Sequence, residues 1–202
     1  MSVRRVVKVG GSLFDLPDLG PRLREWLSRQ PGYSILIAGG GELADVIRGY
    51  DQRFLLGEEY SHTLCVRLLH TAALVLQEIL GSAPLIESIG DSRLFRTAPA
   101  MILSPTRFLL EVDARISRPL PASWSVTTDS VAARVARYLH ADELTLLKSR
   151  LPTDNPLAGR THTLRAWSAA GYVDAYFPRV AGKIPRLRAV NLRETSFPEW
   201  SL

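Results

Sequence analysis

Short apolar runs alternate with segments of helical periodicity along the first part of the chain. Residues 3–9 form a valine-rich run closed by two glycines, and residues 33–38 (YSILIA) form a second run closed by three. Residues 17–30 and 42–55 instead carry apolar side chains at intervals of three and four. This spacing predicts amphipathic helices, whereas the short continuous runs predict strands that are buried on both faces.

The same alternation continues towards the C-terminus. Further strands are predicted at residues 83–88, 100–104, 143–149 and 187–192, and further helices at residues 58–80, 105–113 and 163–170. Residues 117–126 predict a proline-containing loop with a brief strand. Asp129 stands where a helix N-cap is expected, ahead of another amphipathic segment. Residues 90–97 carry no pattern that predicts an element.

Strands that alternate with helices indicate an α/β fold. The expected architecture is a three-layer α/β/α sandwich with a mainly parallel central sheet. We expect residues 1–202 to form a single domain, because 202 residues supply one substantial core and no linker or internal repeat interrupts the pattern.

The composition is that of a folded globular protein, with 46% hydrophobic and 22% charged residues. The most apolar segment, residues 64–80, is interrupted by charged side chains such as Arg67 and Glu78, which predicts a core helix and no membrane span. The N-terminus lacks the pattern of a signal peptide, so a cytoplasmic location is expected. The lone Cys65 cannot form an internal disulfide and is given no catalytic role.

A net charge of +5 indicates an anionic partner. No run of basic residues and no nucleic-acid-binding motif is present, so a small anionic molecule is favoured over a nucleic acid. Only three of the 25 basic residues are lysines: Lys8, Lys148 and Lys183. A lysine supplies a compact point charge of the kind that phosphoryl-transfer sites use, although surface positions would explain these three residues as well.

Two glycine loops follow the first two predicted strands. Gly10, Gly11 and Ser12 end the first strand, and Gly39, Gly40 and Gly41 end the second. The carboxyl ends of parallel strands meet at one edge of a sheet, where backbone amides at helix N-termini can bind phosphate. Neither loop matches the dinucleotide-binding or P-loop pattern, and each alone is also compatible with a tight turn.

Four stretches, taken in order, resemble the amino acid kinase superfamily: VVKVGGSL, ILIAGGGELADVIR, WSVTTDSVAARVA and LTLLKS. The resemblance implies the carbamate kinase-like fold, a homo-oligomer, and an ATP- and Mg²⁺-dependent kinase. It implies that Lys8 neutralises the transferring phosphoryl group and that Asp129 orients Lys8. It also implies that Gly10, Gly11 and Ser12 hold the terminal phosphates of the nucleotide, while Gly39, Gly40 and Gly41 border the acceptor.

The chain departs from the superfamily pattern because it lacks a Gly-Gly-Met segment, which precedes a second catalytic lysine in longer members. Lys148, at the end of LTLLKS, is the favoured second lysine. Lys183, in RVAGKIPRL, is the alternative and a candidate nucleotide-binding residue.

Within the superfamily the chain looks most like a compact branch associated with the biosynthesis of methanofuran-type one-carbon cofactors. The implied acceptor is a phosphate monoester, such as an aminomethylfuran phosphate, that becomes a diphosphate. Arg48 and His62 are candidates for holding it, since guanidinium and imidazolium groups bind phosphate well. A solvated helix face explains Arg48 equally well, and for His62 an ordinary helix cap or surface position is favoured over a role in binding. A carboxylate or amino-acid acceptor, or a nucleotide-binding regulatory protein that has lost catalysis, are the alternative functions.

Overall fold

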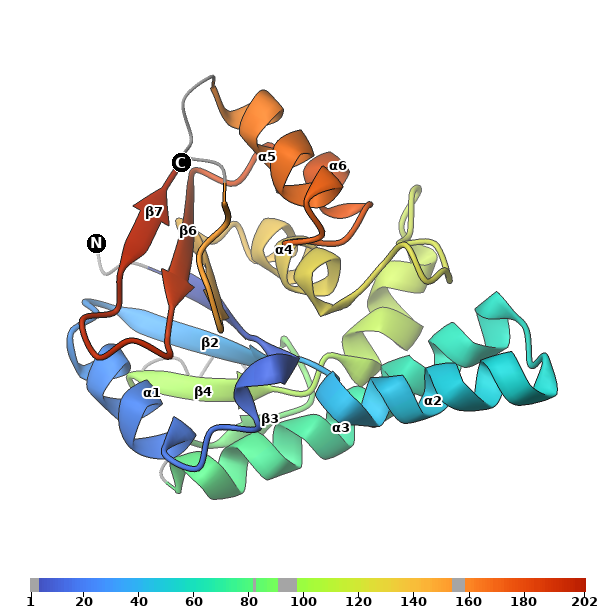
Figure 1. The fold of residues 1–202 in the computed structure, drawn as a ribbon, viewed down its shortest axis with the longest axis horizontal. Coiled ribbons are helices and arrows are strands. Elements are labelled where there is room, and N and C mark those ends of the chain that lie inside the picture. Colours follow the sequence, from blue (N-terminus) through green and yellow to red (C-terminus); the bar gives the residue numbers. More distant parts are fainter. Residues whose placement is uncertain (1–3, 82, 91–97, 154–158) are drawn as a thin grey trace.

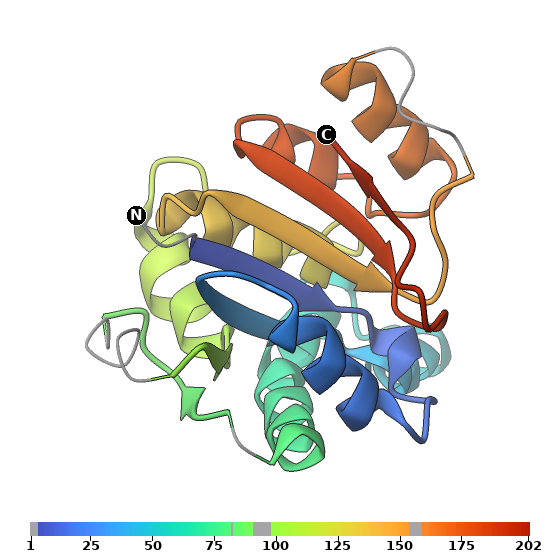
Figure 2. The ribbon, with the colours of Figure 1, turned by 90° about the vertical axis from the view of Figure 1, so that its left-hand side faces the viewer.

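The computed structural model contains one seven-stranded sheet, flanked by helices on both faces (Figures 1 and 2). The structure describes residues 4–81, 83–90, 98–153 and 159–202. The strand order is β3-β4-β2-β1-β5-β6-β7, and every pair is parallel except β6 with β7. The strands are β1 (Arg4–Val9), β2 (Tyr33–Ala38), β3 (Leu85–Ile86), β4 (Ala100–Leu103), β5 (Glu143–Lys148), β6 (Arg186–Asn191) and β7 (Glu199–Ser201).

Helices cover the sheet on both sides, as expected of a mainly parallel sheet. The α-helices are α1 (Leu19–Ser28), α2 (Gly41–Phe54), α3 (Glu58–Leu80), α4 (Thr128–Tyr138), α5 (Arg160–Ala169) and α6 (Phe177–Ala181). Helices α1 and α3 pack together on one face, and α4 lies on the other with α6 against it (Figure 1). The expected α/β/α architecture is therefore confirmed.

Side chains of β1 alternate between the two faces of the sheet. Val7 and Val9 join the core beneath α1 and α3, whereas Val6 joins the core on the α4 side. Lys8 is two residues from Val6 and therefore points to the same face, where its ammonium group contacts Asp129 of α4. The alternation of a strand thus directs the single lysine of β1 towards α4.

The predicted strands and long helices are confirmed, with boundaries that differ by a few residues. The brief strand expected within residues 117–126 is wrong: this segment is irregular, and Ser123 and Trp124 hydrogen-bond to Glu58 at the start of α3. The N-cap assignment of Asp129 is also wrong, because Thr127 is the N-cap of α4 and accepts a hydrogen bond from the Asp129 amide. Most of residues 90–97 lie outside the described part of the chain.

Helix α3 is long and apolar enough to cross a membrane by length and composition alone. Its side chains at Val66, Leu69, Ala73 and Leu76 are nevertheless buried against the sheet, and it contacts β2, β3 and β4. The prediction of a core helix is therefore confirmed.

Candidate functional site

A cluster of three charged side chains lies at the carboxyl edge of the sheet. The Lys8 ammonium is 2.9 Å from Oδ1 of Asp129, and the Lys148 ammonium is 2.7 Å from Oδ2. The side chains of Lys8 and Asp129 are 9% and 5% exposed, and that of Lys148 is 15% exposed. One carboxylate therefore holds two ammonium groups in a nearly buried position.

Strand register explains how these three residues meet. In the parallel pairing of β1 with β5, Lys8 lies opposite Leu146, so Lys148 follows two residues further along the neighbouring strand. Residues two apart in a strand point to the same face, and both lysines therefore face α4. Asp129, in the first turn of α4, lies between them. The structure thus brings Lys148 to Asp129, the arrangement expected if Lys148 is the second lysine.

The two lysines keep the carboxyl group of Asp129 ionised. Burial alone would raise the pKa of this carboxyl group, but Lys148 and Lys8 outweigh burial and lower the pKa to about 2. Burial lowers the pKa of Lys148 more than Asp129 raises it, and the nearby Lys8 lowers it further. Asp129 is therefore ionised at neutral pH.

Residues 172–174, which no sequence motif marks, hold this cluster in place. Lys148 donates a hydrogen bond to the carbonyl oxygen of Tyr172, and its ammonium lies 4.7 Å from the centre of the Tyr172 ring. Asp174 accepts hydrogen bonds from Thr127 and Ser130 at the start of α4. Residues 172–174 thus position both Lys148 and the helix turn that carries Asp129, a role that nothing in their local sequence indicates.

The two glycine loops lie against each other beside the cluster, as predicted. A Cβ atom on Gly11 would be 2.3 Å from the amide nitrogen of Gly41, and a Cβ atom on Gly39 would be 2.5 Å from the amide nitrogen of Gly11. Real Cβ atoms do not approach backbone so closely, so only glycine permits this contact. Gly11 and Gly39 are thus required by backbone packing, independently of any ligand.

Two amides in the first loop are free to bind an anion. Within the described residues, no hydrogen-bond acceptor faces the amides of Gly11 and Ser12. The Gly10 amide, in contrast, donates to the Leu147 carbonyl at 2.8 Å. A cavity of about 490 Å³ borders both loops on the α3 side, but the carboxylates of Asp15, Glu42 and Asp45 line it. An anionic phosphate is therefore favoured on the opposite side, next to the lysines.

Replacing Gly11 by alanine is expected to force the two loops apart. The added methyl group overlaps the Gly41 backbone, which should cost about 2 kcal/mol of stability and lower the melting temperature by several degrees. Gly49→Ala is the matched control: Gly49 lies in α2 with no atom within 4 Å of an added Cβ, so alanine should leave stability unchanged or raise it. Thermal unfolding compares the two variants, and equal melting temperatures would contradict the loop contact.

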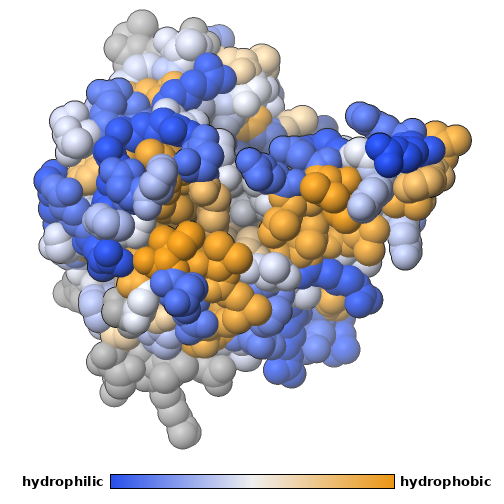
Figure 3. Space-filling view, turned by 60° about the horizontal axis from the view of Figure 1, so that its bottom comes forward, coloured by the Kyte–Doolittle hydropathy of each residue, from blue (hydrophilic) through white to orange (hydrophobic). Residues whose placement is uncertain are grey.

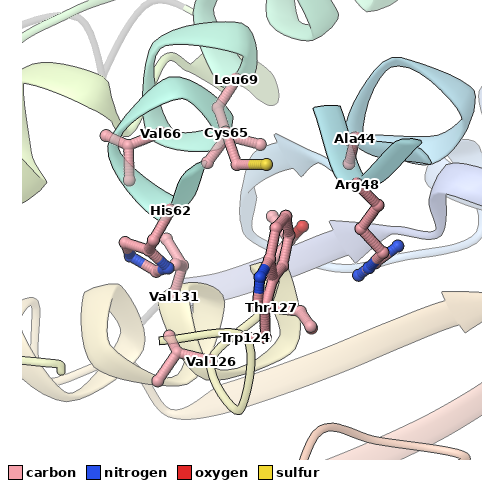
Figure 4. A pocket seen from close by; sticks show the side chains of 12 residues that line it. Ala44, Arg48, His62, Cys65, Val66, Leu69, Trp124, Val126, Thr127 and Val131 are labelled. Atoms are coloured by element: carbon pink, nitrogen blue, oxygen red, sulfur yellow. The ribbon is translucent and has the colours of Figure 1, made fainter. Parts of the chain in front are cut away.

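A narrow pocket of about 60 Å³ lies between α2, α3 and the start of α4 (Figure 4). Gly40, Arg48, His62 and Thr128 contribute to its wall, so it borders both the second glycine loop and the residue that precedes Asp129. The remaining lining side chains are mostly apolar: Ala44, Cys65, Val66, Leu69, Trp124, Val126 and Val131. The structure thus brings the two candidate acceptor residues, Arg48 and His62, into one pocket.

Trp124 lies between Arg48 and His62 in this pocket (Figure 4). Its indole nitrogen donates to Asp51, and the Arg48 guanidinium carbon lies 5.0 Å from its ring centre. Arg48 is also paired with Asp45 at 2.5 Å. His62 donates through Nδ1 to the Ser123 carbonyl in its Nδ1–H tautomer, and burial lowers the pKa of its imidazole. The pocket therefore combines an aromatic wall with one guanidinium and an imidazole whose Nδ1 is already hydrogen-bonded to the backbone.

Lys183 is not part of this site. It lines a different cavity, between α4 and α6, that shares no residue with the pocket of Arg48 and His62 or with the cavity beside the glycine loops. Within the described residues, no group of three or more His, Cys, Asp and Glu side chains is placed to hold a metal ion.

Known proteins resemble this chain in sequence and in fold. No protein-family model matches the chain. The [5-(aminomethyl)furan-3-yl]methyl phosphate kinase of Methanocaldococcus jannaschii is 28% identical over 141 residues, which cover 69% of this chain and 62% of that protein. The match thus spans less than two thirds of the length of this relative, which is a distant homologue.

Solved structures share the whole fold. Uridylate kinase from Archaeoglobus fulgidus superimposes with a TM-score of 0.64 at 12% identity, covering 93% of this chain and 89% of that one. UMP kinase from Ureaplasma parvum gives a TM-score of 0.65 at 12% identity, covering 98% and 93%. The predicted amino acid kinase fold is therefore confirmed.

Proposed function

We propose that this chain is an ATP-dependent kinase that transfers the γ-phosphoryl group to a small phosphate monoester. The observation that carries this proposal is the buried pair of lysines on Asp129, next to two glycine loops and a pocket. Phosphoryl transfer requires little covalent chemistry from a protein and depends on positioning and on fixed positive charge. The fold shared with uridylate kinases and the distant relationship to a phosphate-monoester kinase support the same assignment.

In this proposal the first glycine loop binds the nucleotide. The amides of Gly11 and Ser12 would donate to the terminal phosphates, with Gly10 allowing the close approach of the chain. Lys8 and Lys148 supply two positive charges and Asp129 one negative charge, so the cluster keeps a net positive charge next to the transferring group. Because β1, β5 and α4 hold these side chains, little reorganisation is needed as charge develops in the transition state.

The acceptor would lie in the pocket of Arg48, His62 and Trp124, bordered by Gly39, Gly40 and Gly41. Arg48 is suited to hold the phosphate of the acceptor, whereas His62, whose Nδ1–H is donated to Ser123, could donate to that phosphate through Nε2 only in its protonated form. The aromatic and aliphatic walls are suited to a small ring, and this supports an aminomethylfuran phosphate over an amino-acid acceptor. In this structure the pocket is narrow, so Trp124 would have to shift when an acceptor binds.

Mg²⁺ would be required by the chemistry of ATP. Because no metal-binding cluster is present among the described residues, the ion is expected to arrive bound to the nucleotide phosphates, and no protein ligand is assigned to it.

A coupled ADP-release assay tests the proposal. The acceptor panel comprises an aminomethylfuran phosphate, other phosphomonoesters, UMP, isopentenyl phosphate, acetylglutamate and aspartate. ADP release with a phosphomonoester supports the assignment, whereas release with acetylglutamate or aspartate alone would replace it with a carboxylate kinase. Nucleotide binding with no ADP release for any acceptor would instead favour a regulatory protein without catalysis.

We also infer that the protein is a homo-oligomer assembled through α2. None of the 14 residues of α2 is buried, although Leu43, Val46, Tyr50 and Phe54 share one apolar face that is 38% to 62% exposed. Leu74 and Val75 of α3 are also exposed, and apolar side chains gather on this side of the molecule (Figure 3). A helix of this length is marginally stable without packing, so a second copy would stabilise it.

The substitution Val46→Glu is therefore expected to convert the assembly to a monomer, because it places a charge in the contact. Gln52→Glu adds the same charge on the opposite side of α2 and should leave the assembly intact. Light scattering coupled to size-exclusion chromatography measures both masses. A monomeric wild-type protein would contradict this inference.

A further inference from the structure

The cavity that Lys183 lines is separate from the proposed active site and lies between the outer side of α4, α6 and the loop that follows residues 113–115. Its volume is about 550 Å³. Five basic side chains line it: Arg118, Arg134, Arg137, Arg179 and Lys183. Among the described residues, none of those that line it is acidic. We propose that this cavity binds a small anion that carries two or more phosphate groups.

The charge of the cavity is largely uncompensated. Arg134 lies 3.2 Å from Asp113, but within the described part of the chain no carboxylate is within 4 Å of Arg118, Arg137, Arg179 or Lys183. Like charges gathered around one cavity repel each other, and a polyanion relieves this repulsion. A single exposed arginine needs no partner, whereas five cations that converge on one hollow favour an anionic occupant over a solvated surface.

Part of the cavity is already arranged for binding. Arg134 is 14% exposed and is held from two sides, by Asp113 and by a hydrogen bond to the Arg118 carbonyl. Arg137 follows Arg134 by one helical turn, so both guanidinium groups extend from the same side of α4. On the opposite wall, Val180 is buried, and the Arg179 guanidinium carbon lies 5.4 Å from the centre of the Tyr176 ring. The arginines are thus fixed to two packed helices.

The nature of these side chains indicates the class of ligand. Guanidinium groups bind phosphate oxygens in pairs, and four of the five cations are arginines. The cavity volume of about 550 Å³ is in the range of small-molecule sites. It is larger than the volume that a single phosphate ion would fill. Several phosphate groups in one molecule would contact both walls at once. The site does not depend on the proposed kinase activity, because it shares no residue with the Lys8–Asp129–Lys148 cluster.

Calorimetric titration with inorganic tripolyphosphate tests this proposal. Since tripolyphosphate can also bind beside the glycine loops, the titration is made on the full-length Lys8→Ala variant, in which that site is weakened. One site is expected to remain. Adding Arg137→Ala and Arg179→Ala should weaken it by about 100-fold, since two charge-assisted contacts are lost. Raising the salt concentration should weaken the remaining site as well.

Adding Arg165→Ala to the Lys8→Ala variant is the matched control, because Arg165 is an exposed arginine of α5 outside the cavity. It should leave the affinity unchanged. Thermal unfolding of each variant verifies that the fold is kept. The proposal is overturned if Lys8→Ala abolishes all binding of tripolyphosphate, or if the remaining affinity survives the loss of Arg137 and Arg179. A loss of affinity that Arg165→Ala reproduces equally would also overturn it, since binding would then depend only on net charge.

Discussion

Replacing Lys8 by alanine is expected to lower the rate of phosphoryl transfer by about 10³-fold or more while the protein stays folded. The ammonium of Lys8 is the charge that β1 delivers to the proposed reaction centre, and fixed charges of this kind contribute effects of that size. The fold should survive, because Asp129 keeps its partner Lys148 at 2.7 Å and is not left as an unpaired buried charge.

Steady-state ADP release measures this effect, and circular dichroism verifies the fold. Arg165→Ala is a suitable control, since it removes one positive charge from an exposed position of α5 that lines neither the pocket of Arg48 and His62 nor the cavity beside the glycine loops. An unchanged turnover number in Lys8→Ala would remove Lys8 from the reaction and with it the proposed mechanism.

The substitution Asp129→Asn is expected to have the largest effect on stability. It leaves two ammonium groups buried next to each other without a counter-charge, and breaking a buried ion pair in this way costs about 3–5 kcal/mol. Phosphoryl transfer should be lost as well, because Lys8 and Lys148 lose the group that aligns them. Denaturant unfolding at pH 7 measures the cost. Asp18→Asn is the control, because Asp18 forms an exposed pair with Arg22 that is worth at most about 1 kcal/mol.

The difference in stability between the wild-type protein and Asp129→Asn is expected to depend on pH in a definite direction. The pKa of Asp129 is lowered to about 2 in the folded protein, whereas an unfolded aspartate titrates near 4. The stabilisation that ionised Asp129 provides is thus fully present above about pH 4 and is lost as the pH falls towards 2. The stability gap between wild-type protein and Asp129→Asn should narrow over this interval. A gap that stays constant down to pH 2 would contradict the ion-pair cluster.

The double variant Asp129→Asn, Lys148→Met separates stability from function. It removes one of the two uncompensated charges, so stability should be partly restored. Activity should stay lost, because neither the second lysine nor the aligning carboxylate is present. Recovery of activity together with stability would assign Asp129 and Lys148 to the fold alone.

The sequence predicts the elements whose side chains repeat a clear pattern. Apolar runs such as YSILIA define the central strands almost to the residue, since a strand buried on both faces is a nearly continuous apolar run. No sequence pattern predicts helix α6 or strand β7. Helix α6 has five residues and strand β7 has three, and elements this short show no periodicity. The N-cap of α4 was misplaced by two residues because Thr127 and Asp129 are both residue types that favour this position.

The candidate site could be predicted only in part. The lysine of β1 and the two glycine loops are visible in the sequence because they follow directly on predicted strands. The choice of Lys148 over Lys183 as the partner of Asp129 depends on the register of β5 against β1, which no local pattern encodes. Asp174 and the carbonyl group of Tyr172 act through long-range hydrogen bonds, so the sequence around them carries no signal of their role.

The transfer of the γ-phosphoryl group can be observed directly by phosphorus NMR. Phosphorus NMR of wild-type protein with ATP, Mg²⁺ and an aminomethylfuran phosphate should show the γ-phosphate resonance of ATP decaying while ADP and a diphosphate ester appear together. Under the same conditions Lys8→Ala should leave the spectrum unchanged over the same time. An ATP signal that persists with the wild-type protein for every phosphomonoester tested would rule out the proposed kinase activity, and equal conversion by both proteins would rule out the role of Lys8.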